Sequence, residues 1–250
     1  MQYESIFSQH GFELSDLELG QFGQFLTRFM DYNSHTNLSA IRDDAGIVEK
    51  HFVDSLYGAT LIQSEIFRHR AKSSDPDREK SGTWIASYPR NDDIDNLKSP
   101  RLLDIGSGWG FPGIPLKIVI PELQVTLLDS VGKKVKAMHH FVQELGLTNI
   151  TAIQERAEIL AKNPEHAGQY DFVVSRATAY MSDILTWAVP FLKQSGKIIL
   201  YKMPSEDEKK EITKISKKLK LVLQWELEYS LDGKDRILYV FSRTTGKKVF

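Results

Sequence analysis

The sequence predicts an α/β protein with a doubly wound, Rossmann-like parallel sheet, a helical N-terminal extension and a terminal antiparallel hairpin. From residue 101 onward, short apolar strand patterns alternate with helical patterns, as strand–helix–strand units do. The first of these strands runs directly into a glycine-rich turn, within RLLDIGSGWGFPGIP at 101–115. The last two strand patterns follow one another with no helix between them, which indicates a hairpin.

Residues 1–62 are expected to form a helical extension or cap. Ser15 and Glu18 have the spacing of a capping box, and the residues behind them place one apolar face on a helix: Phe22, Phe25, Leu26 and Phe29. Apolar residues of IVEKHFVDSLYGATLI, at 47–62, also recur at nearly helical spacing. Residues 63–100 are polar, proline-punctuated and without a period, so they bury too little apolar surface to offset chain entropy. We expect them to form a flexible connector.

Residues 101–250 form the expected core. In order, we expect a strand at RLLDIG, a helix at PGIPLKIVI, a strand at VTLLDS, a helix at VGKKVKAMHHFVQELG, a strand and turn at NITAIQERAEIL, a strand at YDFVVSRA, a helix over 181–193, a strand at GKIILYK, a charged helix at SEDEKKEITKISKKLK, and two strands at LVLQWELEYSL and RILYVFSR around Asp232-Gly233.

Composition excludes several classes of protein. The chain has no cysteine, which removes disulfides, thiolate metal sites and cysteine nucleophiles. It has no apolar run of about 18 residues and its start lacks the pattern of a signal peptide, so we expect a cytoplasmic protein without a membrane partner. No metal site is expected, and a monomer is the default. The net charge of −1 is not that of a general nucleic-acid binder. If RNA is a partner, its contacts must come from local cations: Lys133, Lys134 and Lys136, or Arg176 and Lys202.

The glycine turn fits two ligand classes. Gly106, Gly108 and Gly110 form G-x-G-x-G, whereas Gly108, Gly110 and Gly113 form the G-x-G-x-x-G of dinucleotide sites. Both patterns place a ligand at the carboxyl ends of the strands. Asp129, at the end of the second strand, can accept ribose hydroxyls of either ligand.

Electrostatics and prolines separate the two ligands. Asp104 lies directly before the turn, and an unpaired carboxylate close to a pyrophosphate would cost about 1–4 kcal/mol. The same carboxylate suits the ammonium and sulfonium groups of S-adenosylmethionine. Pro112 and Pro115 each remove a backbone donor from the start of the following helix, where a phosphate would bind. The turn is therefore predicted to hold S-adenosylmethionine.

Several motifs together resemble a known family. LLDIGSGWGFPGIPLKI, VTLLDSVGKKVKAM, ERAEIL, YDFVVSRA and the strand ending in Tyr201-Lys202 resemble, in order and spacing, the RsmG family (glucose-inhibited division protein B). NLSAI and KHFVDSL resemble the segment that precedes the family's core. The resemblance implies the sheet of a class I methyltransferase. It also implies methyl transfer to N7 of a guanine in the 530 loop of 16S rRNA, with either the free RNA or the small ribosomal subunit as the substrate. The pair Met203-Pro204 departs from the family, in which Lys-Gly is common.

The resemblance also implies roles for individual residues. Gly106 would approach the cofactor through its backbone, Phe111 would make apolar contact, and Ala157 and Glu158 would contact the adenine. Asp104, Asp129 and Gly108 join this set from the pattern of the turn and the strand ends. The candidate cofactor-binding residues are then Asp104, Gly106, Gly108, Phe111, Asp129, Ala157, Glu158 and Arg176. Phe111 is equally compatible with core packing. The alternatives for the others are turn geometry for Gly108, helix capping for Asp104 and Asp129, and a solvated loop carboxylate for Glu158.

Two basic residues at strand ends are the candidates for the reaction itself. Arg176 ends the fourth strand and could bind the cofactor carboxylate, an RNA phosphate or a structural partner. Lys202 ends the fifth strand and could face the same cleft. His51 and Asp54 lie three residues apart on a helix, where we expect a capping bond or a cleft wall rather than a metal site.

Rival functions are distinguished by their ligands. A small-molecule methyltransferase would share the cofactor half and differ in its substrate. An NAD(P)-dependent oxidoreductase would use the G-x-G-x-x-G pattern, and a non-catalytic nucleotide-binding module is a further alternative.

Overall fold

The computed structural model describes residues 3–36, 41, 43–74, 99–176 and 179–244, with the backbone alone for 69–74. The N-terminal part is helical, with α1 (Glu4–Gln9), α2 (Asp16–Thr36), α3 (Asp44–Ile47), a π-helical turn (Val48–Val53) and α4 (Asp54–Ser74). The core then alternates β1 (Arg101–Ile105), α5 (Gly113–Val119), β2 (Gln124–Asp129), α6 (Gly132–Glu144), β3 (Ile150–Gln154), α7 (Ala157–Leu160), β4 (Tyr170–Ser175), α8 (Met181–Ala188), a 3-10 turn (Val189–Phe191), β5 (Leu192–Lys202), α9 (Glu206–Leu219), β6 (Leu221–Leu231) and β7 (Lys234–Arg243).

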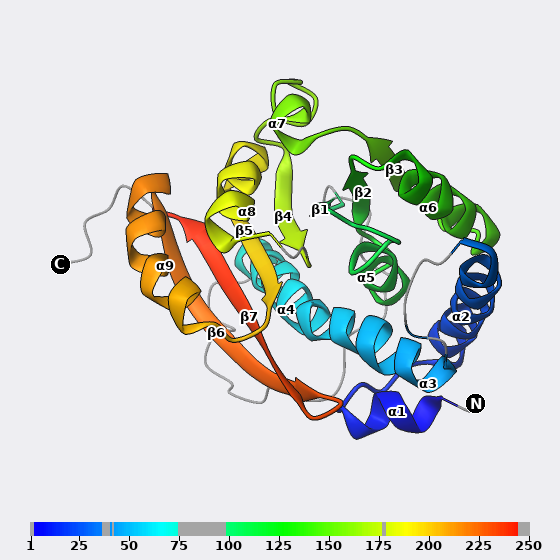
Figure 1. The fold of residues 1–250 in the computed structure, drawn as a ribbon. Helices are drawn as coiled ribbons and strands as arrows, with labels where there is room; N and C mark the ends of the chain where they lie inside the picture. Colours follow the sequence, from blue (N-terminus) through cyan, green and yellow to red (C-terminus); the bar gives the residue numbers. More distant parts are fainter. Residues whose placement is uncertain (1–2, 37–40, 42, 75–98, 177–178, 245–250) are drawn as a thin grey trace.

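One sheet organises the core, with seven strands in the order β3-β2-β1-β4-β5-β7-β6 (Figure 1). Strands β1 to β5 are parallel, and β7 pairs antiparallel with both β5 and β6. The chain reverses between β6 and β7 at Asp232 and Gly233, both with positive φ. The predicted doubly wound sheet with a terminal hairpin is confirmed.

Helices cover both faces of the sheet, so its inner strands β1, β2 and β4 are buried along most of their length. Along β1, Leu102 packs into the cluster formed with α2, α4, α5 and α6, whereas Leu103 packs into the cluster formed with α7, α8 and α9. Because side chains alternate along a strand, Asp104 shares the face of Leu102. This alternation decides where the Asp104 carboxylate lies.

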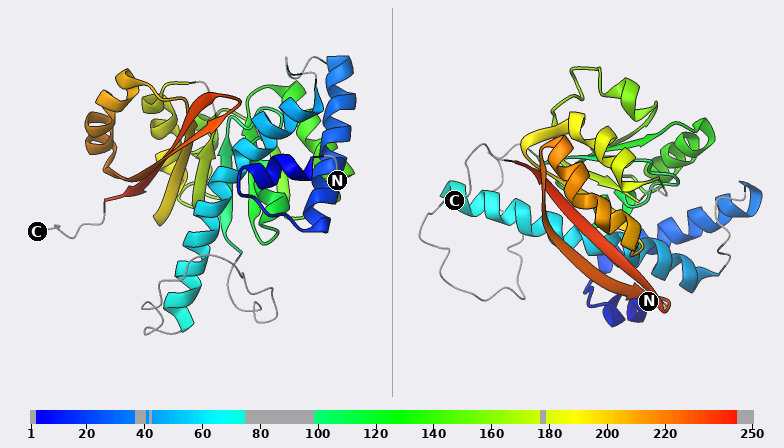
Figure 2. Two further views of the ribbon diagram at one scale, coloured as in Figure 1. Left: turned by 90° about the horizontal axis from the view of Figure 1, so that it is seen from below. Right: turned by 60° about the vertical axis from the view of Figure 1, so that its left-hand side comes forward.

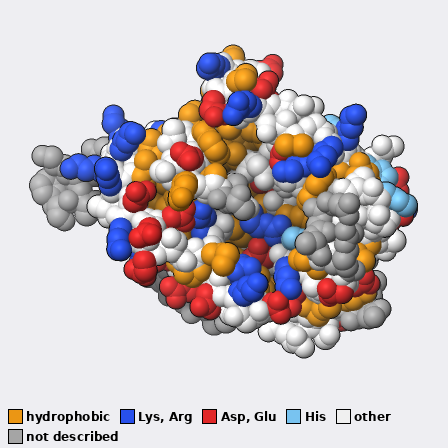
Figure 3. All heavy atoms as spheres, viewed as in Figure 1, with side chains coloured by type: hydrophobic (Ala, Val, Ile, Leu, Met, Phe, Trp, Pro, Cys, Tyr) orange, Lys and Arg blue, Asp and Glu red, His pale blue; other side chains and the backbone are white. Residues whose placement is uncertain are grey.

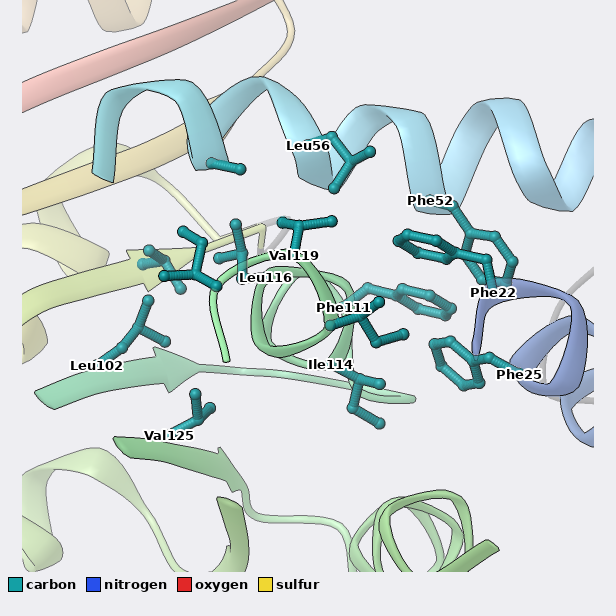
Figure 4. Close-up of a cluster of buried hydrophobic side chains, with 14 of the residues drawn as sticks. Phe22, Phe25, Phe52, Leu56, Leu102, Phe111, Ile114, Leu116, Val119 and Val125 are labelled. Carbon is teal, nitrogen blue, oxygen red and sulfur yellow. The ribbon is translucent and has the colours of Figure 1, made fainter. Parts of the chain in front are cut away.

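The N-terminal helices are part of the core. The predicted capping box is present, since the N–H of Ser15 donates to Oε2 of Glu18 at 2.7 Å. Phenylalanines of α2 and the π-helical turn pack on Phe111, which follows the glycine turn (Figure 4). The rings of Phe25 and Phe111 stack with centroids 5.4 Å apart. The extension therefore packs directly against the segment that shapes the predicted site.

Two predicted boundaries differ from the structure. Helix α4 continues past residue 62 to Ser74, because apolar positions persist at helical spacing up to Ile66, which is buried (Figure 2, left). Residues 63–74 are thus helical rather than part of the connector, whose remainder at 75–98 lies outside the described residues. The helix expected over 181–193 ends at Ala188, since Pro190 has no N–H to continue it, and β5 starts at Leu192.

Candidate cofactor and active site

A cavity of about 460 Å³ opens at the carboxyl ends of β1, β2, β3 and β4. Its lining comes from the glycine turn, the end of β2, the start of α7, the end of β4 and the N-terminal extension. The described lining residues are His51, Ile105, Gly106, Ser107, Gly108, Trp109, Phe111, Leu128, Asp129, Ser130, Val131, Lys134, Glu155, Arg156, Ala157, Glu158, Arg176 and Trp187. Of the predicted site residues, all but Asp104 and Lys202 are in this set.

The glycine turn needs glycine for both conformation and space. Gly106, Gly108 and Gly110 have φ values of 71°, 60° and 96°, which L side chains rarely adopt. A Cβ at Gly110 would also lie 2.4 Å from Cδ1 of Ile114. The turn therefore brings bare backbone to the cavity wall.

Asp104 supports the turn from beneath and does not line the cavity. Its side chain is fully buried, and Oδ2 accepts a hydrogen bond from the N–H of Gly113 at 2.9 Å. Within the described structure, Oδ1 has no hydrogen-bond partner. Burial raises the pKa of Asp104 to about 7, against the opposing effects of the Gly113 hydrogen bond and the nearby Ser107 hydroxyl. Direct contact with a ligand ammonium does not follow from this position, because the side chain points toward the α5 face of the sheet.

Asp129 does face the cavity. Its Oδ2 accepts from the N–H of Gly108 at 3.0 Å and lies 3.4 Å from Nζ of Lys134, while Oδ1 accepts from the N–H of Val131 at 2.9 Å. The carboxylate thus joins the end of β2 to the glycine turn and is held in one orientation. This is the position predicted for recognition of ribose hydroxyls.

The start of α7 forms another part of the wall. Ala157 is buried and is the first residue of the helix, and Glu158 is exposed in its first turn. Arg156 and Trp187 complete this side of the cavity. Apolar contact, backbone and a carboxylate are therefore available where the adenine was predicted.

Arg176 is held from three directions. One guanidinium nitrogen donates to Oδ2 of Asp54 at 3.0 Å and to the carbonyl of Lys50 at 3.1 Å. The other terminal nitrogen lies 3.1 Å from Nδ1 of His51, which must accept because a guanidinium only donates. The guanidinium carbon lies 5.2 Å above the Phe111 ring, within cation–π range. The cavity thus receives a guanidinium fixed by the N-terminal extension.

His51 forms part of the same wall. Its ring stacks on Phe111 with centroids 4.8 Å apart and 19° between the planes. Burial, and then the neighbouring charge of Arg176, lowers the pKa of His51 to about 3. His51 is therefore a neutral imidazole at neutral pH and lines the cavity, as expected for a cleft wall, whereas Asp54 is not among the lining residues.

Lys202 occupies a different position from the one predicted. Its Nζ pairs with Oε1 of Glu208 at 2.8 Å and donates to the carbonyl of Ala179 at 2.9 Å. The two side chains are only 9% and 12% exposed. Lys202 reaches across to the segment after β4, which holds it away from the cavity lining.

Sequence reasoning missed the partner of Arg176. His51 and Asp54 were singled out by their spacing, but nothing in the sequence joined them to a residue more than 120 positions later. Trp109 and Trp187 also line the cavity and carried no sequence signal beyond their size. In the described part of the chain, no group of three or more His, Cys, Asp or Glu side chains could hold a metal ion, and no helix is long and apolar enough to cross a membrane.

Comparison with known proteins places these features in context. A family model described as GidB, rRNA small subunit methyltransferase G, matches residues 90–233. Ribosomal RNA small subunit methyltransferase G of Clostridium novyi (strain NT) is 32% identical over 216 residues, covering 86% of this chain and 74% of that protein. The protein of the same name from Lysinibacillus sphaericus (strain C3-41) is 30% identical and covers 98% of this chain and 91% of its own. Among solved structures, ribosomal protein L11 methylase from Lactobacillus delbrueckii subsp. bulgaricus aligns with a TM-score of 0.48 and 16% identity, covering 60% of this chain and 73% of that chain.

Proposed function

The chain belongs to the rRNA small subunit methyltransferase G family, and we propose that it transfers the methyl group of S-adenosylmethionine to N7 of a guanine in the 530 loop of 16S rRNA. Its fold is that of a class I methyltransferase, and its family methylates ribosomal RNA. The choice of guanine N7, the 530 loop and the assignment of individual residues are our proposal.

The observation that carries the choice of cofactor is the absence of phosphate donors at the start of α5. Pro112 and Pro115 have no N–H. The N–H of Gly113 donates to Asp104 at 2.9 Å, and that of Ile114 donates to a carbonyl of the preceding turn at 2.8 Å. A pyrophosphate needs free N–H groups at this helix start. The described geometry therefore favours S-adenosylmethionine over a nicotinamide dinucleotide.

The cavity also has the size and side chains for this cofactor. Its volume of about 460 Å³ lies within the usual range for small-molecule sites. Asp129 would accept hydrogen bonds from the ribose, Ala157 and Glu158 would contact the adenine, and Gly106 would let the backbone approach closely. Arg176 would bind the cofactor carboxylate, because it lines this cavity and its side chain is 18% exposed. When bound, the cofactor supplies an electrophilic methyl group on a sulfonium.

Methyl transfer to guanine N7 requires neither a general base nor a covalent intermediate from the protein. N7 carries an in-plane lone pair and no proton, so no side chain has to act as a general base. A covalent cysteine adduct is excluded because the chain has no cysteine. The protein's contribution is then positioning, which supplies several kcal/mol in well-oriented reactions. The target base must also leave its stack to reach the cavity.

The charge distribution favours a small number of contacts with RNA. The net charge is −1, and on the face drawn in Figure 3 basic and acidic side chains are interspersed rather than separated by sign. Lys134 and Arg156 line the cavity together with Arg176, and these cations could meet an RNA phosphate there. We expect weak, local RNA contacts and a shallow salt dependence of binding.

The deciding experiment measures radiolabelled methyl transfer to small ribosomal subunits from a strain that lacks this modification. We expect label on RNA, released by nuclease digestion as N7-methylated guanine. A synthetic 530-loop RNA with 7-deazaguanine at the target is the matched control, because it removes N7 and keeps the pairing edge. Label on a metabolite and none on RNA would instead support a small-molecule methyltransferase.

A further inference from the structure

Asp54 lies beside the cavity without lining it. It is the first residue of α4, its side chain is 7% exposed, and it is absent from the described cavity lining. Its Oδ2 is 3.0 Å from a terminal nitrogen of Arg176, which does line the cavity. Asp54 therefore does not line the ligand site itself, and its hydrogen bond to Arg176 connects it to the cavity.

The carboxylate of Asp54 is itself fixed from the other end of the chain. The hydroxyl of Tyr229, in β6, donates to Oδ1 of Asp54 at 2.7 Å. Burial and the Asp54 charge raise the pKa of Tyr229, so its hydroxyl keeps the proton that it donates. The Tyr229 ring stacks on Tyr57 with centroids 3.8 Å apart and 21° between the planes. In the described structure, Oδ2 of Asp54 thus accepts from Arg176 and Oδ1 accepts from Tyr229. The carboxylate therefore cannot rotate without losing at least one of these hydrogen bonds.

The arrangement leaves Arg176 little freedom. Free arginine side chains have many rotamers, and fixing one of them costs conformational entropy. Here Asp54, the Lys50 carbonyl and His51 hold two guanidinium nitrogens, and Phe111 lies under the plane. The Arg176 side chain therefore loses this conformational entropy during folding and not when a ligand binds. A guanidinium prepared in this way binds a ligand carboxylate more tightly than a mobile one.

We propose that Asp54 is the positioning residue of Arg176, and that the N-terminal extension and the terminal hairpin thereby set the affinity of the cavity for the carboxylate end of its ligand. The inference rests on the proposed function in one respect, namely that Arg176 binds the cofactor carboxylate. It assigns a role in ligand binding to the Tyr229–Asp54–Arg176 chain of contacts, whose members come from three separate parts of the sequence.

A double-mutant cycle on binding of S-adenosylhomocysteine, measured by calorimetry, tests this role. We expect Asp54→Asn to weaken binding about tenfold or more, the loss that corresponds to one charge-assisted hydrogen bond. Arg176→Gln should weaken it at least as much. In the Arg176→Gln background, Asp54→Asn should have no further effect, because its target is gone. A purely structural role predicts additive losses in the two backgrounds, and additivity would overturn the proposal.

Tyr229→Phe provides a milder variant should Asp54→Asn fail to fold. It removes one hydrogen bond to Asp54 and keeps the stacked ring, so we expect about threefold to tenfold weaker binding, again only when Arg176 is present. Asp171→Asn is the control and should leave affinity unchanged, because Asp171 pairs with Lys193 at the amino ends of β4 and β5, whereas the cavity lies at the carboxyl ends of the strands. Unchanged affinity in a folded Asp54→Asn protein would overturn the positioning role alone. A wild-type protein that binds no S-adenosylhomocysteine would overturn the proposed function and this inference with it.

Discussion

The carboxylate of Asp129 accepts a hydrogen bond from the backbone N–H of Gly108, with 3.0 Å between N and Oδ2. This bond crosses from the end of β2 to the turn after β1, and it fixes both walls of the cavity relative to each other. Oδ1 accepts from Val131, and a carboxylate oxygen has a second lone pair that a ligand hydroxyl can use. Asp129 therefore both stabilises the turn and offers an acceptor to the ligand.

Asp129→Ala should weaken binding of S-adenosylhomocysteine by at least tenfold in calorimetry. It removes a charged acceptor, and each hydrogen bond to such a group contributes about 1.5–3 kcal/mol. Asp129→Asn should give an intermediate loss, because the amide oxygen can still accept from Gly108 while the amide nitrogen cannot accept at all. Full affinity in a folded Asp129→Ala protein would remove this residue from the binding site.

Two glycines in helix interiors should respond in opposite ways to alanine. A Cβ at Gly23, in α2, has nothing within 4 Å, so Gly23→Ala should stabilise the protein by about 1 kcal/mol through helix propensity. A Cβ at Gly58, in α4, would lie 2.0 Å from Oη of Tyr201. That hydroxyl donates to the carbonyl of Ser55 at 2.8 Å, so it cannot move without losing a buried bond.

We therefore expect Gly58→Ala to lower the free energy of unfolding, by about 1–3 kcal/mol as overpacked sites do. Chemical denaturation of the two variants beside the wild type measures both effects. An increase in stability for Gly58→Ala would show that α4 and β5 are less tightly packed than the contact between Gly58 and Tyr201 indicates. The same protein with Tyr201→Phe should tolerate the alanine better.

The sequence predicted those parts of the molecule that local pattern determines. Alternating strands and helices, the glycine turn and the terminal hairpin follow from periodicity and turn residues, and the structure contains each of them. The roles of Asp104 and Lys202 did not follow, because a position at a strand end fixes the edge of the sheet but not the direction of the side chain. Asp104 points toward α5, and Lys202 toward Ala179 and Glu208.

Contacts between segments that are distant in the sequence were also not predicted. His51 and Asp54 were visible as a spaced pair, yet their partner Arg176 comes from the other side of residues 63–100. Only the packing of α4 against the sheet brings these residues together. The C-terminal end of α4 was predicted wrongly for a related reason. Residues 63–74 look polar in the sequence, but one face of the helix stays in the core through Ile66.

The stability of the ligand-free protein should depend on pH through Asp104. Its pKa is about 7 in the folded protein and 3.8 for an ordinary aspartate, because burial disfavours the charged form. Between these pH values an unfolded chain releases this proton and the folded protein keeps it, so the free energy of unfolding falls as the pH rises from about 4 to about 7. The full contribution is on the order of 4 kcal/mol, present below pH 4 and lost above pH 7.

Asp104→Asn removes this titration, so we expect its stability to exceed that of the wild type increasingly as the pH rises. Urea denaturation of both proteins at pH 5 and pH 8 gives the comparison. His51, with a pKa of about 3, acts in the opposite sense between about pH 6.5 and 3, but its contribution cancels in the difference between the two proteins. Parallel pH profiles would show that Asp104 is already ionised in the folded protein at neutral pH.

Lys202 should stabilise the segment after β4 without contacting the cofactor. It pairs with Glu208, whose Oε1 also accepts from the N–H of Met181 at 2.9 Å, and its Nζ donates to the carbonyl of Ala179. Lys202→Met keeps the apolar stem and leaves the half-buried carboxylate of Glu208 without its cation, so we expect a loss of about 1.5–3 kcal/mol, the contribution of a hydrogen bond to a charged group. We expect a lower melting temperature and an unchanged affinity for S-adenosylhomocysteine. Methylation of small ribosomal subunits should fall more than cofactor affinity, because the pair holds the backbone at Ala179 and Met181. Lys193→Met is the matched control, since its pair with Asp171 is 38% and 30% exposed and should contribute no more than about 1 kcal/mol. A loss of cofactor affinity in Lys202→Met as large as its loss of methylation would place Lys202 in the cofactor site after all.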